Sequence, residues 1–150
     1  MSGSGVRPMR LDDAAGVARL SGQLGYPVDR QEIEARFRSL SEGPDAAVFV
    51  AGDAGGAVVG WIHVAAPRDL VSARYAEVRA LVVDEPHRGR GIGKALLEAA
   101  EAWARERFFD SIRVRSNIAR ERTRGFYERE GYALTKTQYN FHKPLSADRP

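Results

Sequence analysis

The stretch LVVDEPHRGRGIGK, residues 81–94, decides the fold of this chain of 150 residues. A β-branched run ends at a proline, and a basic turn rich in glycine then opens a long amphipathic pattern. The first N–H groups of a helix have no intrahelical acceptors, and the helix dipole is positive there. Because glycines let an anion approach the backbone closely, the turn predicts a phosphate site between a strand and a helix.

Two common phosphate-binding motifs do not fit this turn. A P-loop needs a glycine at position 88 and a hydroxyl at position 95, where this chain has Arg88 and Ala95. A dinucleotide-binding fingerprint that began at Gly89 would need a third glycine at position 94, which is Lys94. That fingerprint also lies near the first strand of its fold, whereas this turn comes late in the chain.

A third pattern, Arg/Gln-x-x-Gly-x-Gly/Ala, is satisfied by Arg88, Gly91 and Gly93. Downstream, a short strand runs to Asn117, and a helical segment carries GFYEREGY at residues 125–132. With these motifs the chain resembles the GNAT superfamily of acyl-CoA-dependent N-acetyltransferases. The resemblance spans essentially the whole chain and is strongest over residues 77–132.

Period-two and helical patterns predict a mixed α/β fold with one core, in a single domain over residues 1–150. The expected strands are 6–9, 47–51, 57–65, 74–83, 111–115, 132–135 and 139–143, and the expected helices are 12–24, 29–40, 91–107 and 119–129. Asp29 and Glu32 predict a capping box, and Gly25 ends the first helix. The resemblance implies a mostly antiparallel, twisted sheet of six to seven strands, flanked by about four helices, in which strands four and five splay apart.

The resemblance also implies how acetyl-CoA, the co-substrate, is bound. The pantetheine arm would pair with the fourth strand, the pyrophosphate would lie on the glycine turn, and a later asparagine and arginines would bind the rest of the molecule. The residues implied are Leu81, Val82, Val83, Arg88, Gly89, Arg90, Gly91, Ile92, Gly93, Lys94, Asn117, Arg120, Arg124 and Tyr127. Arg122 is a further candidate for the adenosine 3′-phosphate.

Two side chains are candidates for catalysis. Tyr127 matches the acid tyrosine of the family, since a phenol stays protonated at neutral pH and can serve a departing thiolate. The alternative for Tyr127 is a tyrosine that only packs in the core. Glu77 is the candidate base; strand alternation would place it on one face with Arg79, Leu81 and Val83. Its alternative is a surface carboxylate paired with an arginine.

Composition excludes several classes of function. The chain has no cysteine, which excludes a thiol nucleophile and fits a reducing cytoplasm. Neither a signal peptide nor a membrane span is expected, and the three histidines show no metal-ligand spacing. Residues 76–150 carry 15 Lys and Arg against 11 Asp and Glu, but without interleaved aromatic residues a nucleotide cofactor explains this better than nucleic acid.

We therefore expect a cytoplasmic N-acetyltransferase that transfers an acetyl group from acetyl-CoA to a primary amine of a small molecule, without a metal. The alternatives are acetylation of protein lysines or N-terminal amines, and a non-catalytic sensor of acyl-CoA. His63 and Tyr26 are further candidates for lining the acceptor site, although a structural role suits each of them. A homodimer formed through the last strands is compatible with the sequence.

Overall fold

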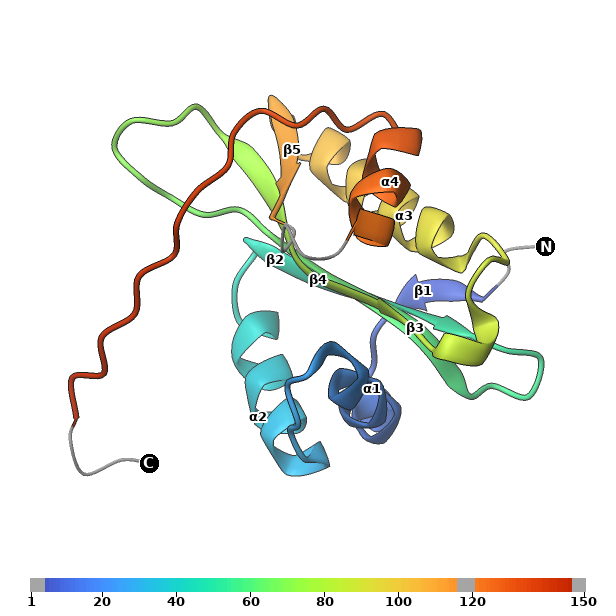
Figure 1. Cartoon of the computed structure of the whole chain (residues 1–150). Helices are drawn as coiled ribbons and strands as arrows, with labels where there is room; N and C mark the ends of the chain where they lie inside the picture. The colour runs from blue at the N-terminus through green and yellow to red at the C-terminus, as the bar shows by residue number, and fades with distance from the viewer. Residues whose placement is uncertain (1–4, 116–120, 147–150) are drawn as a thin grey trace. The chain divides into compact units, whose positions relative to one another are not determined.

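The computed structural model describes residues 5–115 and 121–146 (Figure 1). The chain divides into two compact units, Met1–Arg115 and Ser116–Pro150. The first unit holds the sheet and three α-helices, and the second holds the last helix and the C-terminal segment. A single domain over the whole chain stays a prediction.

The first unit is built on one five-stranded sheet with the order β1-β2-β3-β4-β5. The strands are β1 (Val6–Pro8), β2 (Ala46–Gly52), β3 (Val58–Ala65), β4 (Tyr75–Val83) and β5 (Ser111–Val114). Neighbours from β1 to β4 pair antiparallel, and β4 pairs parallel with β5. The predicted mixed, mostly antiparallel sheet is therefore present.

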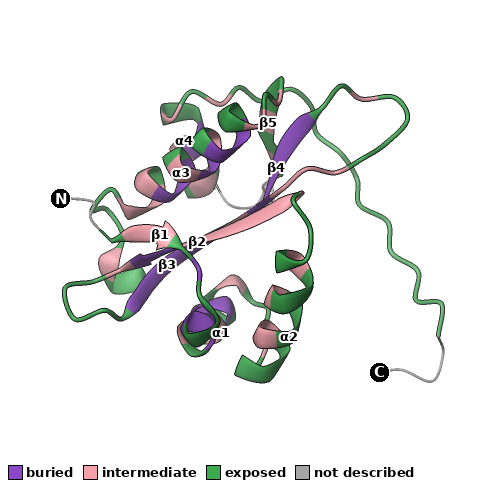
Figure 2. Cartoon of the chain, turned by 180° about the vertical axis from the view of Figure 1, so that it is seen from behind, coloured by how far each residue is buried: buried purple, intermediate pink, exposed green. Residues whose placement is uncertain are grey.

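Helices cover both faces of this sheet (Figure 1). They are α1 (Ala14–Ser21) and α2 (Arg30–Ser41) on one face, and α3 (Ile92–Glu106) on the other. On the α1 face, Val17 and Leu20 pack with Val50, Trp61 and Val82 in one buried cluster. Figure 2 shows the buried residues concentrated where these helices meet the strands.

α3 packs very close to β3 at Gly60. A Cβ atom at Gly60 would lie 3.0 Å from Leu96 Cδ1, 3.1 Å from Ile92 Cγ2 and 3.2 Å from the Val82 carbonyl oxygen. A larger residue at this position would therefore need Leu96, Ile92 or the Val82 carbonyl to shift by a few tenths of an ångström. This close packing fixes the start of α3, where the phosphate site is predicted, against the centre of the sheet.

The predicted helix boundaries agree with the structure at most points. Asp29 and Glu32 form the capping box of α2, and Gly25 adopts a left-handed conformation (φ 86°) after the first helical segment. The expected single helix over residues 12–24 is instead α1 flanked by the 3-10 turns η1 (Leu11–Asp13) and η2 (Gly22–Leu24). Such turns are common at helix ends, where fewer backbone acceptors are available.

β4 carries a bulge at Arg79. His63 of β3 is opposite Ala80, whereas the next residue, Val64, is opposite Val78, so Arg79 has no cross-strand partner. One extra residue reverses the alternation of side chains on the two sides of the bulge. The strand therefore presents different faces before and after Arg79, which the sequence pattern does not reveal.

β4 and β5 pair over only part of β4. Tyr75–Val78 lie opposite Ser111–Val114, and the rest of β4 has no partner on that side among the described residues. The strands form a fork whose closed end lies at Val78 and Val114. This agrees with the predicted splaying of the fourth and fifth strands.

The second unit contains α4 (Glu121–Arg129) and a C-terminal segment without strands. The predicted strands 132–135 and 139–143 are not formed in the described residues, which leaves five strands instead of six to seven. A strand needs a neighbour to pair its N–H and C=O groups, and the described part of this segment has no strand pairing within its own unit. The start of the predicted helix 119–129, at Ala119, lies outside the described residues.

Candidate functional site

The predicted phosphate turn joins β4 to α3. Pro86 lies in the 3-10 turn η3 (Glu85–His87), which ends the strand. Gly89 and Gly91 follow with φ angles of 82° and 80°, a left-handed conformation that glycine adopts without strain. Gly91 is the N-cap of α3, so the helix begins at Ile92, one residue after the start predicted from the sequence pattern.

This turn leaves room and donors for an anion. Among the residues that the structure describes, no side chain caps α3, and the first helical hydrogen bond runs from the Ala95 N–H to the Gly91 carbonyl. The N–H groups of Ile92, Gly93 and Lys94 therefore have no acceptor within the helix. A Cβ atom at Gly91 or at Gly89 would meet nothing within 4 Å, so a ligand can approach the backbone.

The cationic side chains around the turn are exposed. Arg88, Arg90 and Lys94 all reach solvent, and the Arg88 Nε donates a hydrogen bond of 3.2 Å to the Val83 carbonyl. Together with the helix dipole they make the turn electropositive. The turn can therefore hold a phosphate or pyrophosphate group through backbone donors and charge.

The open edge of β4 presents backbone groups next to this turn. The Asp84 N–H donates to the Val59 carbonyl in β3 (2.8 Å), so Asp84 points its backbone groups toward β3. Backbone N–H and C=O groups point to alternate sides along a strand, so those of Val83 and Leu81 point away from β3. On that side this part of β4 has no partner strand in the described chain. An extended ligand can pair there as an added strand.

A buried carboxylate connects the turn to the end of α1, and the sequence analysis did not identify it. Asp84 accepts a hydrogen bond from Gln23 Nε2 (2.8 Å), and Gln23 Oε1 accepts one from the Glu85 N–H (3.1 Å). Arg19 and His87 approach the same carboxylate at 3.5 and 3.6 Å. The Gln23 hydrogen bond, and then the charges of Arg19 and His87, lower the pKa of Asp84.

Glu77 lies near the closed end of the fork and is only 4% exposed. One of its oxygens accepts a hydrogen bond from Arg79 Nη1, and the other lies 3.3 Å from Arg115 Nε. Glu77 is thus paired with Arg79, as in the second expectation, but it is buried and not at the surface, and Arg115 from the other arm of the fork also holds it. Its role as the base stays a prediction. An amine could reach this carboxylate only by sharing or replacing one of these contacts.

The face on which Glu77 lies differs from the prediction. Glu77 is opposite Ala65, and on the far side of the bulge the same face carries Ala80 and Val82, toward α1 and α2. Leu81 and Val83 are on the α3 face, because the bulge at Arg79 shifts the alternation by one residue. The expectation that Glu77 shares a face with Leu81 and Val83 is therefore wrong, whereas its proximity to Arg79 is confirmed.

His63 is on the same face as Glu77, opposite Ala80. Burial, and then the charge of Arg79, lower the pKa of His63 to about 4, so its imidazole is neutral at physiological pH. Its Nε2 atom is buried and has no hydrogen-bond partner among the described residues. Tyr26, the other suggested residue for an acceptor site, is 71% exposed.

Tyr127 belongs to the second unit, in α4, and its position relative to Glu77 is not determined. It is buried, and its ring contacts Phe126 and Tyr132 edge to face, with centroids 5.1 and 5.7 Å away. Burial raises the pKa of Tyr127 to about 12. The hydroxyl therefore stays protonated under physiological conditions, as a general acid requires.

The remaining predicted cofactor residues are also in the second unit. Asn117 and Arg120 lie outside the described residues. Arg124 is exposed and forms an ion pair with Glu128 at 3.4 Å, one turn along α4. Arg122 is exposed as well. A role for these residues in binding the adenosine end of the cofactor stays a prediction.

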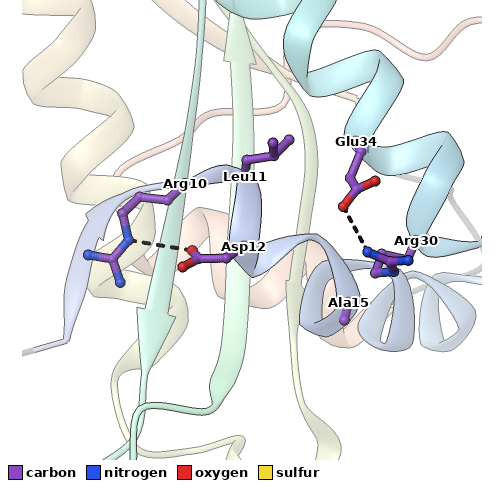
Figure 3. A pocket seen from close by; sticks show the side chains of 6 residues that line it. All are labelled: Arg10, Leu11, Asp12, Ala15, Arg30 and Glu34. Carbon is purple, nitrogen blue, oxygen red and sulfur yellow. Dashed lines mark hydrogen bonds and ion pairs between the residues drawn. The ribbon is translucent and has the colours of Figure 1, made fainter.

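A hollow of about 510 Å³ lies elsewhere in the first unit, between η1 and α2 (Figure 3). It is lined by Arg10, Leu11, Asp12, Ala15, Arg30 and Glu34. Its charges pair with each other, Arg10 with Asp12 at 3.7 Å and Arg30 with Glu34 at 3.0 Å. None of the predicted catalytic or cofactor-binding residues lines this hollow. The phosphate turn and the fork between β4 and β5 therefore lie outside it.

Neither a membrane-spanning helix nor a metal-binding group is found among the described residues. None of the helices there is long and apolar enough to cross a membrane. Over residues 5–115 and 121–146, no three His, Asp or Glu side chains come together in a way that could hold a metal ion.

Comparison with known proteins places the chain among acetyltransferases. The sequence model of the Acetyltransferase (GNAT) family matches residues 17–132. An uncharacterized N-acetyltransferase of Chlorobaculum tepidum is 29% identical over 136 residues, covering 89% of this chain and 78% of the relative. The aminoalkylphosphonate N-acetyltransferase of Salmonella typhimurium is 37% identical over 91 residues, covering 60% of this chain and 58% of the relative.

Solved structures share the fold. The structure of AAC(6')-Iy in complex with the bisubstrate analogue CoA-S-monomethyl-acetylneamine has a TM-score of 0.82 and 18% identity, and the match covers 93% of this chain and 97% of that chain. The predicted resemblance, the mixed α/β fold class and the prediction of an acyltransferase enzyme are thus confirmed. The chain belongs to the GNAT family of acetyltransferases.

Proposed function

We propose that this protein transfers an acetyl group from acetyl-CoA to a primary amine of a small molecule. The observation that carries the proposal is the turn at Gly89 and Gly91, which opens α3 with unpaired N–H groups, free space and three exposed cations. A pyrophosphate satisfies those donors and charges together. The complex of AAC(6')-Iy with a CoA-containing analogue supports the same choice of donor.

The open edge of β4 would bind the pantetheine arm. Its amide groups would pair with the backbone groups of Leu81 and Val83, in the way of an added strand. The arm would run from the phosphate turn toward the closed end of the fork. The thioester would then lie near Val78 and the buried Glu77.

The chemistry requires a neutral amine, a polarised carbonyl and a proton for the thiolate. Glu77 would accept the proton of the amine, directly or through water, and Tyr127 would donate a proton to the departing sulfur. A backbone N–H on the open edge of β4, beyond those that pair with the arm, would stabilise the oxyanion of the tetrahedral intermediate. No covalent intermediate is needed, which suits a chain without cysteine.

A homodimer is proposed as the functional form. Leu134, Tyr139, Phe141 and Leu145 of the C-terminal segment are at least 60% exposed, and apolar side chains gathered in one segment are typical of a protein–protein contact. Light scattering at micromolar concentration measures this directly. A cytoplasmic location stays a prediction.

The test is a panel of amines, with CoA release from acetyl-CoA measured by a thiol reagent. The panel holds short alkyl amines, amino acids, aminoglycosides and a lysine peptide. We expect turnover with at least one small amine. Turnover with the peptide alone would favour protein acetylation, and acetyl-CoA binding without turnover would favour a sensor.

A further inference from the structure

Three arginines surround the closed end of the fork. Arg79 occupies the bulge of β4, while Arg113 and Arg115 lie two residues apart at the end of β5. Arg79 and Arg115 hold the two oxygens of Glu77, and the Arg113 guanidinium stacks over the Tyr75 ring, 3.8 Å from its centroid.

The negative charges of the carboxylates near this cluster are fewer than the positive charges of its three arginines. Glu77 offsets one charge, and the second carboxylate is Asp69 in the loop before β4, whose pKa is lowered first by the backbone N–H groups of Ser72 and Val71 and to a smaller extent by the charge of Arg113. His63 on the same face adds no charge, since burial keeps its imidazole neutral. Three guanidiniums thus face two carboxylates, which leaves one positive charge beside the proposed base.

The guanidiniums of Arg79 and Arg115 keep donors for a ligand. Their side chains are 50% and 76% exposed, whereas Glu77 is nearly buried. Within residues 5–115 and 121–146, Glu77 is the only carboxylate that pairs with either of them. Each guanidinium has five N–H donors, and in the described part of the chain the contacts to Glu77 run from Arg79 Nη1 and Arg115 Nε, so further donors can turn to a ligand.

We propose that Arg79 and Arg115 bind an anionic group of the acceptor, so that the preferred substrates are small amines that also carry a phosphonate, phosphate or carboxylate. This inference rests on the proposed function, which places the reacting amine at Glu77. Both guanidiniums contact Glu77, so an anion held by them lies within a short chain of the amine. Planar guanidinium groups match the geometry of such oxyanions. The same positive charge disfavours a polycationic acceptor.

The experiment compares acceptors whose primary amine is carried on a chain of two or three methylenes. The probes are aminopropylphosphonate and β-alanine as anionic amines, aminopropanol as the neutral one and diaminopropane as the cationic one. The measured quantity is kcat/KM for CoA release at low salt. We expect the anionic amines to exceed aminopropanol by about tenfold or more, the scale of a hydrogen bond to a charged group, and diaminopropane to be the poorest acceptor.

Variants separate recognition from a purely structural role. Arg115→Gln should lower the ratio of anionic to neutral kcat/KM about tenfold, and Arg115→Glu should invert the preference toward diaminopropane. Arg79→Gln should act in the same direction where circular dichroism shows it folded. Arg105→Gln, which removes an exposed charge on α3, is the matched control and should leave the ratio unchanged.

A structural role, in which the arginines only neutralise Glu77, would change kcat/KM for all four acceptors by the same factor. That result, or a wild-type preference for neutral or cationic amines, would overturn the inference while CoA release still supports the proposed function. An absence of CoA release with every amine would overturn the proposed function, and this inference with it.

Discussion

Tyr127 is the residue with the most specific predicted role. Tyr127→Phe keeps the ring and its contacts with Phe126 and Tyr132 and removes only the hydroxyl. If the hydroxyl protonates the thiolate, turnover should fall by about 100-fold or more, a typical contribution of general acid–base catalysis. Steady-state CoA release measures this, with acetyl-CoA affinity as the control. Full activity in the folded variant would assign Tyr127 to packing alone.

Glu77 has a role that can be separated from binding of the donor. Glu77→Gln should lower turnover on a chosen amine and leave acetyl-CoA affinity nearly unchanged. The loss should shrink at high pH, where more of the amine is already neutral. A pH–rate profile of wild type and variant is the measurement. Superimposable profiles would leave Glu77 as a buried partner of Arg79 and Arg115, and favour proton transfer through water.

His63 predicts a dependence of stability on pH. Its pKa is about 4 when folded and 6.5 in the unfolded chain, so between these values the unfolded state binds more protons. The free energy of unfolding should therefore decrease as the pH falls from about 6.5 to 4, by up to about 3 kcal/mol from this residue. Urea denaturation of wild type and His63→Gln over this range measures the contribution. If the free energy of unfolding changed with pH by the same amount in the two proteins, the contribution of His63 would be excluded.

At the scale of elements, Gln23 connects η2 to the turn after β4. Gln23→Ala removes the hydrogen bond to Asp84 and the one from the Glu85 N–H, leaving a buried carboxylate with fewer partners. We expect a loss of about 1–2 kcal/mol in the free energy of unfolding, together with weaker acetyl-CoA binding because the turn is less firmly held. Gln31→Ala, at an exposed position of α2, is the control. Equal effects of the two variants would exclude the positioning role of Gln23.

Local signals in the sequence account for the elements that were predicted correctly. The capping box at Asp29 and Glu32 and the left-handed glycines at the ends of helices depend on residues within one or two turns of each other. The phosphate turn is local in the same sense. The bulge at Arg79 and the Gln23–Asp84 contact, 61 residues apart in sequence, depend on which strands and helices meet in space. No periodicity within one segment contains that information.

The C-terminal segment shows a different limit of the sequence pattern. Alternating apolar residues predict strands at 132–135 and 139–143, and alternation does specify an extended chain. A strand also requires a partner with free backbone groups, which alternation does not supply. The same limit applies to Glu77, because its face and its two arginine partners depend on the bulge and on β5, which the pattern of β4 alone does not contain.

For the whole molecule, the expectation on which all the others depend is that the turn between β4 and α3 binds the phosphates of acetyl-CoA. Isothermal titration calorimetry with a chelator present tests it on the full chain. Gly91→Asn and Gly91→Asp form a matched pair, because both side chains tolerate the left-handed conformation at this position and they differ in charge.

We expect wild type to bind one acetyl-CoA per chain with a dissociation constant in the micromolar range or below. Gly91→Asp should bind at least tenfold more weakly than Gly91→Asn, since its carboxylate faces the phosphates at close range. Millimolar or chelator-sensitive binding by wild type, or equal affinities in the two variants, would contradict the claim.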